Sequence, residues 1–322
     1  MLPQPDDLTD ELDRRLRSED DQRTAAFLMN LLARSAPAQP DRVDHVLEHL
    51  AASPQWAILT ASPDSDHECG PTDPDNVAVD LMTALTVMND TPYARTVVSS
   101  WFSKPLSSPH RVTRALISLR SLMNPAQSIG PPVQARTFSL LTLSLEQLNA
   151  AFADAEQAPE ISEDLRRQVT STIQIAEDIT QHLYFASGAF SQKNPSRSSA
   201  PVGDLGRFSA FALPLLDAFS AIHHPAVTHH IVETIDHIGA IEPKRAFLIA
   251  AKAVTQDPAY PREVLALDAT VRLVRHYTAD HRSLALSDLQ CATAIRNMLE
   301  AFVRLGWDKA IQLAEELDEL FL

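Results

Sequence analysis

The densest group of side chains that could do chemistry is a run of histidines between His223 and His237. Within it, His229, Glu233 and His237 recur every four residues, so a helix would place all three on one face. Imidazole and carboxylate groups with this spacing are typical ligands of zinc and other divalent ions. The first and last of the three would lie about 12 Å apart at the rise of a helix. A single ion would therefore need ligands from a second helix.

A simpler interpretation of this face is a solvated polar surface. Histidines four residues apart arise readily by chance in a chain that holds 12 of them. We favour that interpretation and keep a metal held by His229, Glu233 and His237, structural or catalytic, as the alternative. No cofactor is predicted.

A second candidate is a strip of charged side chains along Val264–His281 and just beyond it. A helix would place most of these residues together, opposite a broad apolar face. They are Asp268, Arg272, Arg275, His276 and Arg282. A pair four residues apart, such as Asp268 and Arg272, stabilises a helix by roughly 0.2–0.5 kcal/mol, so a structural role explains much of the strip. The alternative is a basic groove that binds an acidic segment of a partner or of the chain's own N-terminal part.

Motifs of the commonest enzyme classes are missing from the sequence. There is no His-Glu-x-x-His, no Gly-x-Ser-x-Gly and no Gly-x-x-x-x-Gly-Lys. The chain has 7 glycines in 322 residues, whereas average usage is roughly 7%. Phosphate-binding loops need glycine where the backbone approaches a ligand. A non-enzymatic protein is favoured, and an enzyme that uses the histidine face is the alternative.

The charge is strongly and unevenly negative. The net charge is −15, and residues 1–80 carry 17 acidic side chains against 6 basic ones. Such a surface repels phosphate backbones, so we do not expect nucleic-acid binding.

The compartment can be inferred from the cysteines and the apolar runs. Cys69 and Cys291 lie far apart and form no disulfide framework, which favours a reducing compartment. The N-terminus has no apolar secretion signal, and the longest apolar run, Phe208–Phe219, is interrupted by Pro214 and Asp217. We expect a cytoplasmic protein without a membrane segment. Arginine outnumbers lysine by 22 to 5, which hints at a bacterial source.

Prolines separate the expected helices. In pairs such as Thr91-Pro92 and Ser108-Pro109, a side chain that can cap a helix stands before a residue suited to its first turn. Between the prolines, apolar residues recur at helical spacing and no stretch alternates with period two. The sequence therefore predicts an all-α fold without a β-sheet.

The expected helices have roughly the following bounds: 6–17, 20–35, 41–52, 55–61, 75–89, 93–103, 110–124, 133–156, 160–187, 204–222, 226–241, 244–255, 262–286, 288–305 and 308–320. An acidic loop is expected at 62–73. The helix at 288 is expected to begin with a capping box from Ser287 to Gln290 and to end at Gly306.

One expected helix, around Val264–His281, is apolar over more than half its circumference. Such a helix needs neighbours on two sides, as an inner helix of a stacked array has. The helices at 244–255 and 288–305 are the expected neighbours, and Val271 is expected in the buried face.

Helix pairs recur every 35–45 residues or so, for example from Pro92 to Pro132 and from Pro225 to Pro261. This spacing resembles that of HEAT and armadillo repeats, loosely over residues 75–322 and best from 204 onward. The resemblance implies an irregular α-solenoid, a stack of antiparallel helical hairpins.

Three regions are expected along the chain. Residues 1–187 form an acidic N-terminal helical region, residues 188–203 a Ser- and Pro-rich linker, and residues 204–322 a C-terminal helical-repeat region. We expect a protein–protein interaction scaffold or adaptor, a subunit of a larger bacterial assembly. Self-association is left open. The alternative is a metal- or ligand-binding helical bundle that uses the face of His229, Glu233 and His237.

Overall fold

The computed structural model describes residues 5–19, 21–54, 74–127, 129–158, 162–192 and 202–321. Within these ranges the chain forms helices and turns and contains no β-strand, which confirms the all-α class. The chain divides into two compact units. Unit 1 comprises Met1–Leu119 and Pro131–Leu143, and unit 2 comprises Arg120–Gly130 and Ser144–Leu322.

Unit 1 is a set of short helices with a small shared core. They are α1 (Pro5–Leu16), α2 (Gln22–Ser35), α3 (Pro40–Ala51), α5 (Pro74–Ala84) with a π-helical turn after it (Leu85–Asn89), α6 (Pro92–Ser103), a 3₁₀ turn (Pro105–Ser107), α7 (Pro109–Met123) and α8 (Pro131–Leu143). The last turn of α7 is assigned to unit 2. α1 packs on α2 and α3, α2 on α5, α3 on α6, and α6 on α8. Met29, Leu47 and Phe102 lie in this core.

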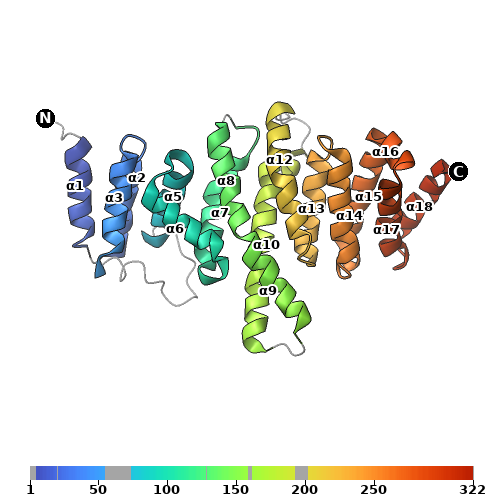
Figure 1. The fold of residues 1–322 in the computed structure, drawn as a ribbon, viewed down its shortest axis with the longest axis horizontal. Helices are drawn as coiled ribbons and strands as arrows, with labels where there is room; N and C mark the ends of the chain where they lie inside the picture. Colours follow the sequence, from blue (N-terminus) through green and yellow to red (C-terminus); the bar gives the residue numbers. More distant parts are fainter. Residues whose placement is uncertain are drawn as a thin grey trace. The chain divides into compact units, whose positions relative to one another are not determined.

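Unit 2 contains the longer helices. They are α9 (Leu145–Gln157), α10 (Glu163–Ser187), α11 (Ala189–Gln192), α12 (Val202–Phe219), α13 (Pro225–Ile238), α14 (Pro243–Gln256), a 3₁₀ turn (Tyr260–Arg262), α15 (Val264–Asp280), α16 (Arg282–Ser287), α17 (Leu289–Val303) and α18 (Asp308–Phe321). α10 packs on α13, α13 on α15, and α15 on α18, while α12 packs on α14 and α14 on α17 (Figure 1). The irregular α-solenoid remains a prediction.

Proline begins many of these helices, as expected. At α6 the proline follows Thr91, whose backbone is extended and whose side chain makes no capping hydrogen bond. Instead, Asp44 of α3 accepts hydrogen bonds from the backbone N–H groups of Tyr93 and Ala94, both at 2.8 Å, and from Thr91 Oγ1 at 2.9 Å. A neighbouring helix thus supplies the cap, which joins α3 to α6.

Two expected helices are broken in the structure. The single helix expected over 133–156 is instead α8 and α9, which meet at Ser144, a fully buried residue. The helix expected over 262–286 is a 3₁₀ turn followed by α15 and α16, with the break at His281. Apolar periodicity continues through both breaks, so it did not signal them.

The start of α17 also differs from the expectation. The N-cap is Asp288 rather than Ser287, and Asp288 Oδ1 accepts from the N–H groups of Gln290 and Cys291. A carboxylate suits the positive end of a helix. Gly306, with φ 77°, follows the end of α17 as expected.

The helix α15 is internal, and of its two expected neighbours only α17 packs on it extensively. It packs mainly on α13 and also on α17 and α18. α14 touches it through the rings of Phe247 and Tyr277, which stack with centroids 4.0 Å apart. Val271 is only half-buried, whereas Val274 is fully buried.

The boundary between the units does not coincide with the expected linker. Residues 188–203 fall within unit 2, and 193–201 lie outside the described residues. The helix expected at 55–61, the loop at 62–73 and Cys69 also lie outside them. No helix in the described part of the chain has the length and hydropathy needed to cross a bilayer.

Candidate functional site

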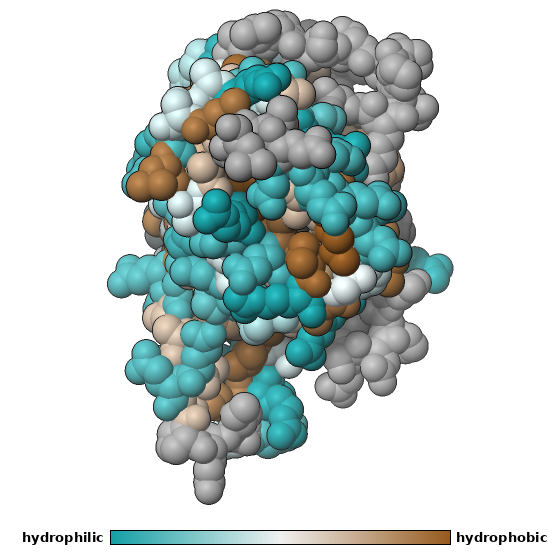
Figure 2. All heavy atoms as spheres, turned by 90° about the vertical axis from the view of Figure 1, so that its right-hand side faces the viewer, coloured by the Kyte–Doolittle hydropathy of each residue, from teal (hydrophilic) through white to brown (hydrophobic). Residues whose placement is uncertain are grey.

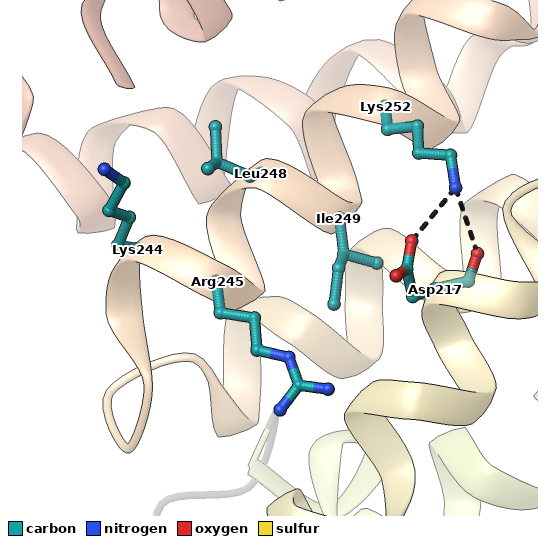
Figure 3. Close-up of a pocket in the computed structure, with 6 residues that line it drawn as sticks. All are labelled: Asp217, Lys244, Arg245, Leu248, Ile249 and Lys252. Carbon is teal, nitrogen blue, oxygen red and sulfur yellow. Dashed lines mark hydrogen bonds and ion pairs between the residues drawn. The ribbon is translucent and has the colours of Figure 1, made fainter. Parts of the chain in front are cut away.

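A groove runs over α14 in unit 2 (Figure 3). It has a volume of about 460 Å³. Its walls are Asp217 of α12 and, from α14, Lys244, Arg245, Leu248, Ile249 and Lys252.

The sequence of α14 separates an anchoring face from an exposed one. Phe247 and Ala250 are buried and fix the helix to its neighbours. Lys244, Leu248 and Lys252 are spaced four residues apart and therefore follow one line along the other side. The helix itself contains cations and no carboxylate. Its exposed face is consequently both aliphatic and basic.

The carboxylates that accompany these cations come from other helices. Lys252 Nζ lies 3.0 Å from Asp217 Oδ1 and also donates to the Asp217 carbonyl oxygen at 3.3 Å (Figure 3). Lys244 Nζ lies 2.6 Å from Asp288 Oδ2. This hydrogen bond raises the pKa of Lys244 and lowers the pKa of Asp288. The ion pairs thus tie α14 to α12 and α17.

The ion pairs at the rim of the groove can exchange their carboxylate partner for an acidic group of a bound molecule. Arg245 is exposed, and its pair with Glu242 at 3.3 Å lies within one turn of α14. Exposed ion pairs of this kind contribute only about 0–1 kcal/mol each, so acidic groups of a ligand can replace them at little cost. Ile249 forms a largely buried floor, and Leu248 remains half-exposed. The groove fits a molecule that presents both apolar and acidic groups.

The charged strip expected on α15 lies in ion pairs between neighbouring helices. Arg272 donates to Glu233 Oε1 at 2.6 Å and to Asp236 Oδ2 at 2.8 Å, both on α13. Nδ1 of His276 lies 2.8 Å from Asp236 Oδ1. Burial lowers the pKa of Arg272, but its bonds to Asp236 and Glu233 outweigh that effect and the net pKa is raised.

The other members of the strip face α18 or solvent. Nη2 of Arg275 lies 3.1 Å from Glu316 Oε1, and Lys309 Nζ lies 2.6 Å from Asp268 Oδ1. Arg282 is exposed on α16. The strip therefore joins α13, α15 and α18, and a contact of the strip with a partner stays a prediction.

The histidine face lies on α13, with different contacts at each position. Glu233 is 7% exposed and accepts the hydrogen bond from Arg272. His237 lies beside Gly188, the residue before α11, where an added Cβ would come within 3.6 Å of its Nε2. In the described part of the chain, no three His, Cys, Asp or Glu side chains are grouped to hold a metal ion.

Two imidazoles of α13, His230 and His237, lie where α10 packs on α13, and a third, His182, lies on α10 and is coupled electrostatically to Arg120 of α7. Burial lowers the pKa of each. The effect is largest at His230, whose pKa falls to about 4. Its ring stacks on that of Tyr184 at a centroid distance of 5.8 Å. The three imidazoles are neutral at neutral pH, and those of His230 and His237 belong to the packing between α10 and α13.

The chain was compared with protein-family models, curated proteins and solved structures, and none of them matches.

The groove over α14 was not recognised from the sequence. The available signal was the spacing of Lys244, Leu248 and Lys252 in a helix without a carboxylate. The contribution of Asp217 could not be inferred, because nothing in the sequence shows that α12 packs on α14.

Proposed function

We propose that this protein is a non-enzymatic interaction module, a scaffold or adaptor that binds an acidic amphipathic helix of another protein in the groove over α14. One observation carries the proposal. The aliphatic side chains Leu248 and Ile249 lie between three cations, Lys244, Arg245 and Lys252.

The chemistry of the groove favours a helical ligand with two kinds of side chain. An amphipathic helix lays its apolar residues into a hydrophobic groove at helical spacing. Its acidic residues would meet Lys244 at one end of the line along α14 and Lys252 at the other. These charges would guide association and select against basic ligands, while the aliphatic contact would supply affinity.

The proposal includes a cytoplasmic location and a place in a larger bacterial assembly. The well-separated cysteines and the composition of the chain support this part. Another subunit would then supply the helix that occupies the groove.

The alternative of a metal or ligand site at His229, Glu233 and His237 has weaker support. Glu233 already accepts a short hydrogen bond from Arg272. Releasing this carboxylate for a metal would leave a half-buried guanidinium with one partner fewer. Zinc titration of the protein and of His229→Ala tests this alternative directly.

The proposal can be tested with a synthetic peptide as the probe. The peptide carries leucine at positions i, i+3, i+4 and i+7 and glutamate on both flanks, and a matched peptide carries lysine in place of each glutamate. Fluorescence anisotropy should show that the acidic peptide binds the full chain and that the basic peptide does not.

Charge reversal provides the control. The variant Lys244→Glu/Lys252→Glu should weaken binding of the acidic peptide by about 100-fold, roughly tenfold for each reversed contact. Lys309→Glu/Arg275→Glu makes the same change of charge on α18 and α15 and should leave binding within about twofold. Equal losses in both variants would show non-specific attraction and would refute the groove.

A further inference from the structure

A second groove in unit 2 lies between α17 and α18, and it differs in character from the groove over α14. It has a volume of about 210 Å³. Its apolar lining comes from Ala292, Ile295, Leu299 and Val303 of α17 and from Ala314 and Leu317 of α18. Figure 2 views the molecule from the side on which α18 lies, where hydrophobic residues gather in small areas among hydrophilic ones.

The apolar residues of α17 lie on two different faces of the helix. Met298 and Phe302 are fully buried, and α17 packs on α14. Ala292 and Val303 are half-exposed and lie at the two ends of a stripe that continues round the helix into the groove. The middle of this stripe is already mostly buried, so its exposed apolar area is modest. The charged groups on the rim must therefore set which ligand the groove selects.

The rim carries three charged groups, Arg296 and Glu300 of α17 and Asp318 of α18, and the two on α17 stand in a self-complementary order. Arg296 and Glu300 are exposed and lie one helical turn apart. Among the described residues, Arg296 makes no ion pair, and Glu300 pairs only with Arg304 one turn further along. When two copies of α17 run antiparallel about a two-fold axis level with residue 298, each Arg296 faces Glu300 of the other copy.

The same axis also matches the apolar residues. It places Ala292 within one residue of the level of Val303 of the other copy, a small side chain beside a larger one, and Ile295 within two residues of the level of Leu299. A two-fold interface forms every contact twice, so this register gives two ion pairs and also brings the two ends of the apolar stripe near each other. An unrelated helix would have to reproduce this order of charge by coincidence.

We propose that two copies of this chain pair through the groove between α17 and α18, with their α17 helices antiparallel and Arg296 of each copy paired with Glu300 of the other. This interface is separate from the groove over α14, so an α14-bound helix and a dimer can coexist. The dimer would present two α14 grooves and make the module bivalent. A bivalent module binds a partner with two acidic helices far more tightly than it binds a single helix.

Sedimentation equilibrium on the full chain tests the pairing. The wild-type protein should show a monomer–dimer equilibrium. Arg296→Glu and Glu300→Arg should each raise the dissociation constant by about tenfold or more, because each places like charges opposite one another at two points. The double variant Arg296→Glu/Glu300→Arg should restore the wild-type constant. Circular dichroism should show the same helix content in all three variants.

Disulfide trapping tests the register independently. In a Cys69→Ser background, Ala292→Cys and Val303→Cys are prepared as separate proteins. Mixing them under mild oxidation should give the mixed dimer faster than either protein gives its own dimer. A chain that stays monomeric at all concentrations overturns the proposal. A dimer that neither charge reversal weakens, or that the double variant fails to restore, overturns it as well.

Discussion

A single buried carboxylate, Asp44, secures the start of a neighbouring helix in unit 1. It is 5% exposed and accepts three hydrogen bonds at the N-terminus of α6. Asp44→Ala should lower the free energy of unfolding by about 2–4 kcal/mol, because it leaves two buried N–H groups and one hydroxyl unpaired. Urea denaturation measures the loss. Asp41→Ala, an exposed change on the same helix, should cost less than about 1 kcal/mol, and equal losses would contradict the capping role.

On α15, a substitution of Arg275 can distinguish a structural role of the charged strip from a role in binding a partner. Its side chain is half-exposed and pairs with the equally exposed Glu316. Arg275→Glu should change the free energy of unfolding by no more than about 1 kcal/mol. If the α15 strip binds a partner, the same change should weaken that binding while leaving the α14 groove unaffected. Anisotropy titration with the acidic peptide distinguishes the two surfaces.

At the scale of elements, α15 depends on the residues that face its neighbours in unit 2. Val274 is fully buried, whereas Val271 is only half-buried. Val274→Asp should cost several kcal/mol, because a carboxylate there has neither water nor a partner. Val271→Asp should cost markedly less. Thermal melting of the two variants compares them, and equal melting temperatures would mean that α15 is not packed as described.

The contact between α10 and α13 should weaken in mild acid. Burial lowers the pKa of His230 to about 4, and that of His237 is lowered as well. Below the unfolded value of about 6.5, the unfolded chain binds protons that the folded chain does not. Stability is therefore complete above that pH and falls as the pH drops toward 4.

The size of this effect can be measured at His230. Its contribution between pH 7.5 and pH 5 is about 2 kcal/mol, from about 1.4 kcal/mol per pKa unit. Urea denaturation of the wild type and of His230→Gln at both pH values should show a smaller loss in the variant. An identical pH dependence in both proteins would contradict the buried, neutral state of this imidazole.

Across the elements, the sequence predicted helix positions better than helix contacts. Pro92, Pro225 and Pro243 stand at helix starts in the structure, since proline in the first turn removes no hydrogen bond that the helix would make. The breaks at Ser144 and His281 were missed, because apolar spacing runs through both. The stacking of α15 on α13 rather than on α14 was missed as well, since a wide apolar face does not specify which helices cover it.

At the scale of the whole molecule, the helical spacing of apolar residues and the prolines at helix starts predicted the all-α class. Nothing in the sequence predicted the two compact units. The Ser-rich segment at 188–203 was the most visible boundary in the sequence, yet the compact units divide at Ser144 and within α7. Composition reports where a chain is polar, and it does not report which helices share a core. For the same reason, the sequence indicates a site at the histidine run and not at the α14 groove, because the residues that line the groove come from separate helices.

The central claim is that the groove over α14 binds an acidic amphipathic helix, and site-specific photo-crosslinking tests it most directly. A photoreactive amino acid replaces Leu248 in one protein and the exposed Leu265 of α15 in another, and each is irradiated with the acidic peptide. The peptide should crosslink at position 248, not at position 265, and Lys244→Glu/Lys252→Glu should abolish the product. Equal crosslinking at both positions, or crosslinking at 248 that survives the charge reversal, would contradict the claim.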